Sequence, residues 1–343
     1  MIKPPALRRG DRVAAVSLSW GGSGLFSHRY NAGKRQLEEA FGVTVVASRC
    51  ALADAAWLAA HPEARASDLM EAFADPSIRA IISTIGGDDS IRLLPFLDFA
   101  LIRNNPKIFL GYSDSTVTHF ACFKAGVVSF YGPSIMAGFG ENGGLFPYMA
   151  AAVRQVLFSK EAPVQVLPNV DGWTYERLDW AKPELQTQRR KLHPCSGWRW
   201  LQGSGIHRGG LIGGCLEVVD WLRGTPVWPE LSVWRKSILF LELSEETISP
   251  SAVVRILRSI AATGALQEVR GILFGRPYGE EAGFAAYDSA LLQVCRELGL
   301  QSLPLVTRMD FGHTDPMFIV PYGVEAEIDC NRQQLHYTEA GTS

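Results

Sequence analysis

Apolar and polar positions follow two kinds of pattern along the first third of the chain. Short, almost fully apolar runs predict buried strands at 12–19, 43–48, 78–86 and 107–113. Longer stretches with apolar residues at helical spacing predict helices at 30–42, 62–75 and 89–105. Strands that alternate with helices are typical of a mostly parallel sheet with helices on both faces. We therefore expect an α/β fold in which ligands bind at the carboxyl ends of the strands.

The alternation of predicted strands and helices ends at about residue 159. The next forty residues are rich in Pro, Gly, Gln and charge, which predicts a connection between domains. A second patterned region starts near Trp198 and predicts strands at 237–242 and 269–275 and helices at 249–266 and 287–300. Two domains are therefore expected.

Composition narrows the class of protein. The 343 residues are 47% hydrophobic and 20% charged, with a formal net charge of −2. This balance offers no electrostatic footprint for a nucleic acid polymer or an anionic membrane, so a small-molecule or short-peptide partner is favoured. The apolar stretch at 13–18 is too short for a signal peptide, and no run approaches a membrane-spanning length. We expect a cytoplasmic protein.

Neither a metal nor a cofactor is expected. The six cysteines are widely scattered without a C-x-x-C pair, which is typical of reduced core thiols rather than of a zinc site or disulfide framework. The glycine-rich stretch "IGGDDS" (85–90) lacks the Gly-Lys-Ser/Thr of a phosphate loop, and no G-x-G-x-x-G follows the first strand.

Ser113 stands between the apolar strand at 107–113 and a stretch with helical spacing. Ser113, Asp114 or Ser115 could cap the helix, because such side chains accept hydrogen bonds from its first free N–H groups. Alternatively, Ser113 is a nucleophile on a tight strand-to-helix turn, where the helix N-terminus favours developing negative charge. These residues alone favour the cap.

A serine nucleophile needs a base, and seven histidines are available. His119 lies more than one helical turn beyond Ser113 and cannot reach back to its hydroxyl. His313 lies in the glycine-flanked turn "DFGHTDP" (310–316) and is equally compatible with a base and with an ordinary loop histidine. The other five, in polar or loop contexts typical of solvated surface residues, are His28, His61, His193, His207 and His336.

The base needs an orienting carboxylate, and the oxyanion needs hydrogen-bond donors. Glu242 ends an apolar strand, where a charge either meets water or serves a site. Glu245 and Glu246 are expected in a solvated turn. Gly86 and Gly87 leave backbone N–H groups open to close approach, although a generic glycine turn has the same pattern.

Taken together, these motifs resemble the LD-carboxypeptidase family of serine peptidases, in its microcin C immunity branch. The stretches that carry the resemblance run in order through almost the whole chain: "LRRGDRVAAVS", "ARASDLMEAFADPSIRAIISTIGGDDSIRLLPFLDF", "NPKIFLGYSDST", "FYGPS", "GWRWLQGSG", "LIGGCLEVVDWLRGT", "ILFLELSEE" and "FGHTDP". The resemblance implies a catalytic triad of Ser113, Glu242 and His313. It also implies an oxyanion hole formed by the Asp114 N–H and an N–H of Gly87 or Gly86.

The resemblance also implies an architecture. An N-terminal α/β domain (1–165) would carry the nucleophile, and a connection (166–195) would lead to a smaller, β-rich C-terminal domain (196–343) that brings the Glu and His across a cleft. The family uses no metal, and a homodimer is expected. The first strand departs from the pattern, because it ends "SLSWGG" where relatives often have a Pro-Ser turn.

Two substrate classes follow from the resemblance. One branch trims a terminal D-alanine from murein tetrapeptides, and the other cleaves an amide or acyl sulfamate bond between an amino acid and a nucleotide analogue. In the second branch a tryptophan of the connection stacks on the nucleobase. Trp180 is the first candidate here and Trp173 the second, although either could instead pack at the domain interface. Asp88 and Ser90 are candidate substrate-binding residues.

We expect self-immunity or detoxification by cleavage of a nucleotide-linked compound such as processed microcin C. Murein trimming and a non-enzymatic small-molecule binding module are the alternatives. Transfer of the acyl group to an acceptor other than water would use the same triad.

Overall fold

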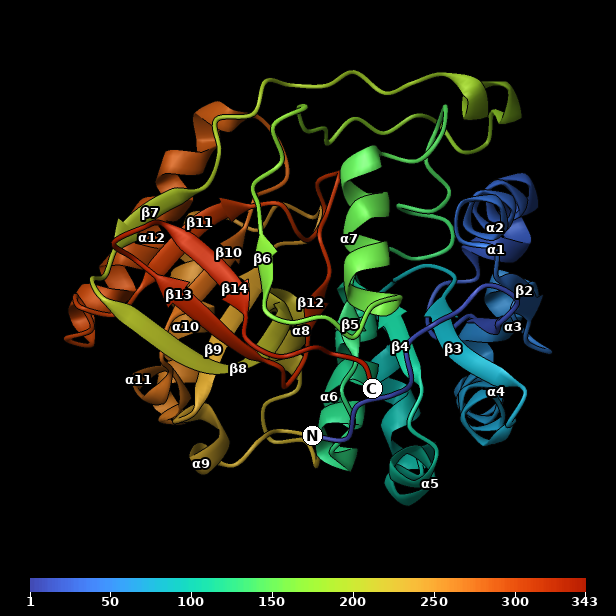
Figure 1. The fold of residues 1–343 in the computed structure, drawn as a ribbon, viewed down its shortest axis with the longest axis horizontal. Coiled ribbons are helices and arrows are strands. Elements are labelled where there is room, and N and C mark those ends of the chain that lie inside the picture. The colour runs from blue at the N-terminus through green and yellow to red at the C-terminus, as the bar shows by residue number, and fades with distance from the viewer.

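Two β-sheets organise the chain, and the computed structural model describes all of residues 1–343 (Figure 1). The first sheet has the strand order β12-β5-β4-β3-β1-β2, in which β1 to β5 are parallel and β12 is antiparallel to β5. Its strands are β1 (Arg12–Val16), β2 (Thr44–Ala47), β3 (Ile78–Ser83), β4 (Ile108–Gly111), β5 (Phe130–Tyr131) and β12 (Val320–Pro321).

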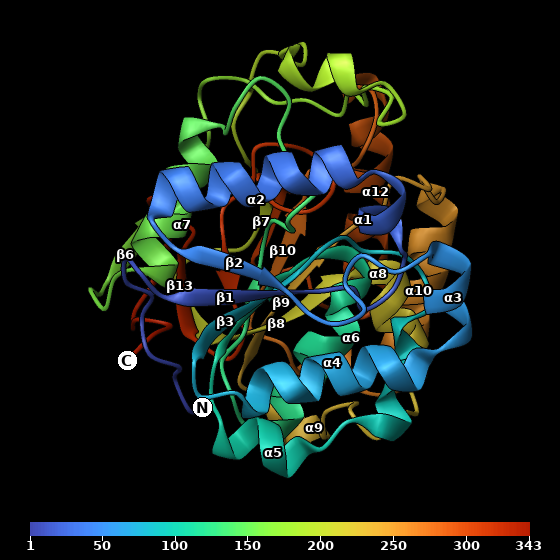
Figure 2. The ribbon, with the colours of Figure 1, turned by 90° about the vertical axis from the view of Figure 1, so that its right-hand side faces the viewer.

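Helices cover both faces of the first sheet, and in Figure 2 α2 lies on one side of it and α4 on the other. This arrangement explains why β4 is buried at every position. The helices are α1 (Gly22–Leu25), α2 (Ser27–Phe41), α3 (Ala55–Ala60), α4 (Pro62–Ala74), α5 (Phe99–Asn104), α6 (Thr116–Ala125) and α7 (Pro147–Leu157), with 3₁₀ turns η1 (Ser90–Phe96) and η2 (Ser113–Ser115). The expected α/β fold is confirmed.

The single helix expected at 89–105 is wrong. A 3₁₀ segment, η1, contains Pro95, whose ring supplies no backbone N–H. The chain then leaves helical geometry, and α5 begins only after Asp98, whose carboxylate accepts hydrogen bonds from the N–H groups of Ala100 and Leu101. Pro95 and the Asp98 cap therefore divide a segment that its apolar spacing predicted as one helix.

The second sheet has the strand order β6-β14-β13-β8-β9-β10-β11-β7. Its centre, β8 to β11, is parallel, and both edges are antiparallel. The strands are β6 (Val164–Val166), β7 (Arg199–Gln202), β8 (Ile206–Cys215), β9 (Ser237–Glu242), β10 (Ile272–Gly275), β11 (Leu305–Met309), β13 (Glu325–Asp329) and β14 (Gln334–Tyr337). Its helices are α8 (Leu216–Trp221), α9 (Leu231–Trp234), α10 (Pro250–Ala262), α11 (Ala265–Glu268) and α12 (Phe284–Glu297), with the 3₁₀ turn η4 (Glu281–Gly283).

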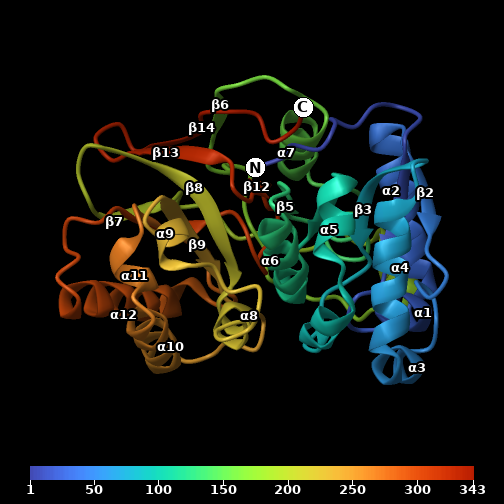
Figure 3. The ribbon, with the colours of Figure 1, turned by 90° about the horizontal axis from the view of Figure 1, so that it is seen from below.

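The N-terminal half of the chain forms most of the first sheet and the C-terminal half forms most of the second, but the two halves exchange strands and share one core. β12 comes from the C-terminal half but pairs with β5 in the first sheet, whereas β6 precedes the connection but pairs with β14 in the second. A single hydrophobic cluster runs through both sheets, from Leu7 to Tyr337. Figure 3 shows α6 beside α8 where the halves meet. These links fix the ends of β4 and β9 relative to one another.

The connection between β6 and β7 crosses the top of the molecule in Figure 1 and contains the 3₁₀ turn η3 (Pro183–Thr187). It is tied to both halves. Thr174 forms paired backbone hydrogen bonds with Asp315 of the second half, and Asn142 of the first half donates to the carbonyl of Leu185. None of the helices combines the length and the hydropathy that a membrane-spanning segment requires.

Candidate active site

Ser113 lies on a strained turn directly after β4. Its φ of 61° lies in the left-handed region, which L-residues other than Asn and Asp seldom adopt. Three hydrogen bonds hold the turn: the Ser113 N–H donates to the Tyr131 hydroxyl (2.9 Å), the Thr116 hydroxyl donates to the Ser113 carbonyl (2.7 Å), and the Ser90 N–H donates to Asp114 Oδ2 (2.8 Å). Two of these bonds use the Ser113 backbone, and the Ser113 hydroxyl forms no capping hydrogen bond with α6.

The helix cap, which was the alternative to a nucleophile at this turn, is absent. No side chain of Ser113, Asp114 or Ser115 accepts a hydrogen bond from the first N–H groups of α6. The Asp114 carboxylate instead bonds to Ser90, and the Ser115 hydroxyl is buried without a partner. The interpretation of Ser113 as a cap is therefore wrong.

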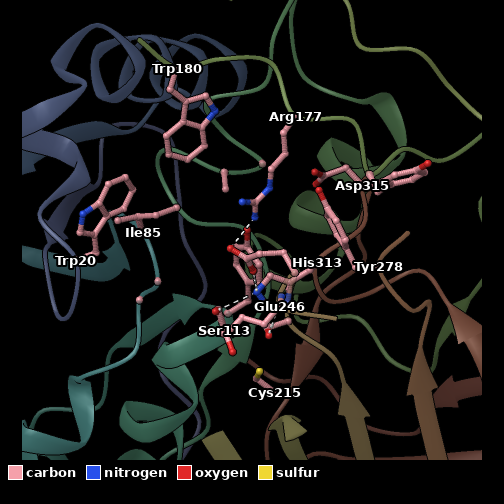
Figure 4. A pocket seen from close by; sticks show the side chains of 18 of the residues that line it. Trp20, Ile85, Ser113, Arg177, Trp180, Cys215, Glu246, Tyr278, His313 and Asp315 are labelled. Atoms are coloured by element: carbon pink, nitrogen blue, oxygen red, sulfur yellow. Dashed lines mark hydrogen bonds and ion pairs between the residues drawn. The ribbon is translucent and has the colours of Figure 1, made fainter. Parts of the chain in front are cut away.

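His313 of the C-terminal half contacts Ser113 (Figure 4), and Glu242 of the same half contacts His313. Nε2 of His313 lies 3.0 Å from the Ser113 hydroxyl oxygen, and Nδ1 lies 2.7 Å from Oε2 of Glu242. Glu242 is the last residue of β9 and is fully buried, and His313 follows β11 in a turn. A carboxylate at Nδ1 requires a proton on that nitrogen, which leaves Nε2 to exchange a proton with the serine.

A glycine makes room for this carboxylate. A Cβ atom on Gly312 would lie 2.4 Å from Oε2 of Glu242 and 2.7 Å from its Cβ, and φ at Gly312 is 100°. Both the space and the backbone conformation therefore exclude a larger residue next to His313.

Tyr131 connects Ser113 with Glu242 and is a functional candidate that the sequence analysis missed. Its hydroxyl accepts the hydrogen bond from the Ser113 N–H and donates to Oε1 of Glu242. The Tyr131 side chain is fully buried. The only sequence signal was its place in "FYGPS", at the end of a short apolar strand beside β4.

Charge on His313 is favoured by its neighbours. Burial disfavours the imidazolium, but the adjacent Glu242 carboxylate and, more weakly, Glu245 outweigh it, so the pKa of His313 rises to about 9. Oε2 of Glu245 lies 3.1 Å from His313 Nε2, and Arg177 of the connection pairs with Oε1 of Glu245 at 2.6 Å. Glu245 is therefore a half-buried contact of His313 and not the solvated turn residue that was expected.

Donors for an oxyanion surround the serine. A Cβ atom on Gly86 would lie 2.9 Å from the Ser113 hydroxyl oxygen, so the glycine backbone packs directly against that side chain. The N–H groups of Gly86 and Gly87 donate to no acceptor within the protein. Gly87 has a φ of 148°, and a Cβ there would collide with Ser19. Together with the Asp114 N–H at the start of η2, these groups could stabilise a negatively charged oxygen.

A cavity of about 530 Å³ opens above Ser113 and His313. Its aromatic end contains Trp20, Phe26 and Trp180: Trp20 and Trp180 are near parallel with ring centroids 6.3 Å apart, and Phe26 meets Trp180 edge-on. Arg29 lies 4.3 Å above the Trp180 ring. Figure 4 shows Trp20 and Trp180 facing the space above the serine. A flat apolar group could bind at this end.

The other predicted site residues separate into two groups. Asp88 is exposed and lines the cavity. Ser90 and Trp173 lie outside it. Ser90 is buried and donates through its hydroxyl to the Asp114 carbonyl, and Trp173 is buried against His193 with its indole N–H donating to the Pro194 carbonyl.

His119 takes no part in the cavity. It is fully buried, with Nε2 2.9 Å from the Gly111 carbonyl and Nδ1 2.8 Å from the Ser129 hydroxyl, and burial lowers its pKa to about 3. No group of three or more His, Cys, Asp and Glu side chains could hold a metal ion, and all six cysteines are free.

Comparison with known proteins identifies two family domains in this chain. Residues 13–132 match the LD-carboxypeptidase N-terminal domain and residues 208–328 match the LD-carboxypeptidase C-terminal domain. The chain is 31% identical over 278 residues to the microcin C7 self-immunity protein MccF of Escherichia coli, with 80% of this chain and 78% of that protein covered. It is 30% identical to a putative carboxypeptidase of Vibrio cholerae (96% and 95% covered) and 26% identical to a probable murein peptide carboxypeptidase of Bacillus subtilis (99% and 95% covered).

Solved structures show the same fold. An MccF-like protein from Streptococcus pneumoniae in complex with AMP superimposes with a TM-score of 0.85 at 32% identity, covering 95% of this chain and 98% of that one. MccF in complex with aspartyl sulfamoyl adenosine superimposes with a TM-score of 0.85 at 27% identity, with both chains fully covered.

Proposed function

The chain belongs to the LD-carboxypeptidase family and is a hydrolase, and we propose that it cleaves the acyl bond of aminoacyl nucleotide compounds with a triad of Ser113, Glu242 and His313. The contact of His313 with both other residues carries the proposal. Such cleavage would inactivate a toxic aminoacyl nucleotide and so give self-immunity or detoxification.

The reaction follows from this geometry. The Ser113 oxygen attacks the carbonyl carbon while Nε2 of His313 accepts the hydroxyl proton. Glu242 stabilises the imidazolium that forms at Nδ1, and the N–H groups of Gly86, Gly87 and Asp114 bind the oxyanion.

His313 then gives its proton to the leaving nitrogen, and the bond between this nitrogen and the carbonyl carbon breaks. A water molecule, activated by the same nitrogen of His313, attacks the acyl-serine ester and releases the amino acid.

The aromatic end of the cavity favours a nucleotide leaving group. A nucleobase is flat and apolar on its faces, and Trp180 and Trp20 offer surfaces of the same kind. In the free protein Trp20 and Arg29 pack on Trp180, so a base would take over one of these contacts. The AMP and aspartyl sulfamoyl adenosine bound by the two structural relatives support the same substrate class.

Murein peptide trimming is the second candidate. The Bacillus subtilis relative is named for that activity, and the guanidinium groups of Arg29 and Arg190 line the cavity, where they could pair with the free carboxylate of a terminal D-alanine. The Arg190 guanidinium already pairs with Glu141 and Asp315, and only Arg29 is without a carboxylate partner. Arg29 alone could therefore bind a substrate carboxylate, and the preference for the nucleotide rests on the aromatic end of the cavity.

The test compares two substrates with the purified protein. We expect aspartyl sulfamoyl adenosine to be hydrolysed with a higher kcat/KM than murein tetrapeptide. Ser113→Ala should abolish both activities, and Glu242→Gln should lower kcat strongly because the imidazolium loses its carboxylate. Equal or faster cleavage of the tetrapeptide would replace this proposal with murein trimming. Binding without any turnover would favour a binding module, and an acyl product other than the free amino acid would favour transfer.

A further inference from the structure

One nitrogen of His313 has two partners. Nε2 lies 3.0 Å from the Ser113 hydroxyl oxygen and 3.1 Å from Oε2 of Glu245, while Nδ1 is already taken by Glu242. In the proposed reaction Nε2 must receive a proton from the serine and pass it to the leaving group. In the free protein a carboxylate oxygen therefore competes for the nitrogen that does this work.

We propose that Glu245 is a specificity-determining residue that binds a free ammonium group on the carbon next to the scissile carbonyl, and that this binding draws its carboxylate away from His313. The inference rests on the proposed function and narrows its substrate class to compounds with an unacylated α-amino group. Aminoacyl nucleotides have such a group, whereas the residue before the scissile bond of a stem peptide has its α-nitrogen in an amide.

The Glu245 carboxylate lies close enough to the attacking serine oxygen to bind an α-ammonium group of the substrate. Both oxygens touch the same imidazole nitrogen, so the Glu245 carboxylate and the attacking serine oxygen lie within one substrate residue of each other. In an aminoacyl group the α-nitrogen is two bonds, about 2.5 Å, from the carbonyl carbon that the serine attacks. An ammonium group in this position meets Glu245 without displacing the triad.

The local charge favours a cation. Glu217 of α8 also lines the cavity, contacts Ser244 next to Glu245, and is 8% exposed. Its Oε1 accepts hydrogen bonds from the N–H and the hydroxyl of Ser244, and it has no cationic partner. Arg177 is the one guanidinium at Glu245, and its side chain is 59% exposed on the connection. A buried carboxylate with hydrogen bonds but no counter-ion leaves negative potential that a substrate ammonium would neutralise.

The experiment measures kcat/KM for alanyl sulfamoyl adenosine and for its Nα-acetyl form. The native protein should prefer the free amine by roughly 10-fold or more, as for loss of a charged hydrogen bond. Glu245→Gln should remove most of this preference. Glu184→Gln, which makes the same charge change at an exposed glutamate of the connection outside the cavity, should retain it.

A pH profile separates this role from a structural one. The groups that face His313 are Glu242, Glu245, Glu217 and the ring edge of Tyr112, with Arg177 behind Glu245. Removing the Glu245 charge lowers the pKa of His313, so kcat/KM for the Nα-acetyl compound should begin to rise at a lower pH in Glu245→Gln than in the native protein. Substitution of a merely structural residue would reduce activity at every pH without changing the pH at which kcat/KM begins to rise.

Failure of this inference is distinct from failure of the proposed function. If neither sulfamoyl compound is cleaved by the native protein, the proposed function fails, and the same comparison is made with L-alanyl-D-alanine and its Nα-acetyl form. Equal cleavage of either pair by the native protein, or a preference for the free amine that persists in Glu245→Gln, would overturn the role of Glu245. Absence of cleavage of all four compounds would overturn both proposals.

Discussion

Ser113 and His313 are 200 positions apart in the chain, yet the serine hydroxyl oxygen lies 3.0 Å from the imidazole Nε2. Each residue follows a parallel strand, β4 in one sheet and β11 in the other. The carboxyl ends of the two sheets therefore open toward the same cavity. The exchange of β6 and β12 between the sheets fixes the position of these ends relative to each other.

Backbone strain at Ser113 gives a prediction about stability. Both Ser113→Ala and Ser113→Gly should lose hydrolysis, because the attacking oxygen is gone. Glycine tolerates a φ of 61°, so Ser113→Gly should be more stable than Ser113→Ala by about 1 kcal/mol. Urea unfolding of the two variants checks this order. A less stable glycine variant would mean that the turn carries no strain.

Tyr131→Phe should reduce both stability and kcat. The change leaves the Ser113 N–H and Oε1 of Glu242 without their partner, at a cost of about 1–3 kcal/mol for buried groups left unpaired. Tyr337→Phe is the matched control, since it loses a buried hydroxyl that donates to the Ile319 carbonyl and bonds to none of Ser113, Glu242 and His313. The control should lose stability and keep turnover. Full activity of Tyr131→Phe would exclude a role for this tyrosine in positioning Glu242.

The pH dependence of kcat/KM should reflect His313. Its pKa rises to about 9 because Glu242 and Glu245 outweigh the effect of burial, so the imidazole is mostly protonated at neutral pH. Activity should therefore increase with pH up to about 9, and Glu242→Gln should move the rise to lower pH. A rise centred near 6.5 in the native protein would contradict the coupling.

The same raised pKa makes a prediction for unfolding. Because the folded-state pKa lies above the ordinary value, the stabilisation is fully present below about 6.5 and is lost as pH rises through about 9. The free energy of unfolding should fall over this window, and the fall should be smaller in His313→Gln. An identical pH dependence in that variant would assign the loss to other groups.

Trp180→Ala should mainly raise KM for a nucleotide substrate. Loss of one stacking contact of roughly 1–3 kcal/mol corresponds to about 5- to 150-fold in KM when chemistry is slow, with kcat little changed. Trp57→Ala is the control, because Trp57 is a half-exposed residue of α3 that stacks on His61 outside the cavity. Unchanged kinetics of Trp180→Ala would assign this tryptophan to packing against Trp20 and Phe26.

Local patterns of the sequence determined the α/β class and put two of the triad candidates, Ser113 and Glu242, at the end of a strand. Full burial of a parallel strand leaves a continuous apolar run, and Ser113 and Glu242 are the polar residues at or just after the end of such runs. The order of motifs along the chain supplied the family resemblance, and through it the choice of His313 among seven histidines.

Only the tertiary structure decided which side chains meet. The contact of Glu245 with His313, the bridge of Tyr131 between Ser113 and Glu242, and the burial of Trp173 outside the cavity have no local signature. The physical reason is that spacing along a strand or helix fixes which face a residue occupies. What lies opposite that face depends on strand order and on contacts between segments far apart in the chain.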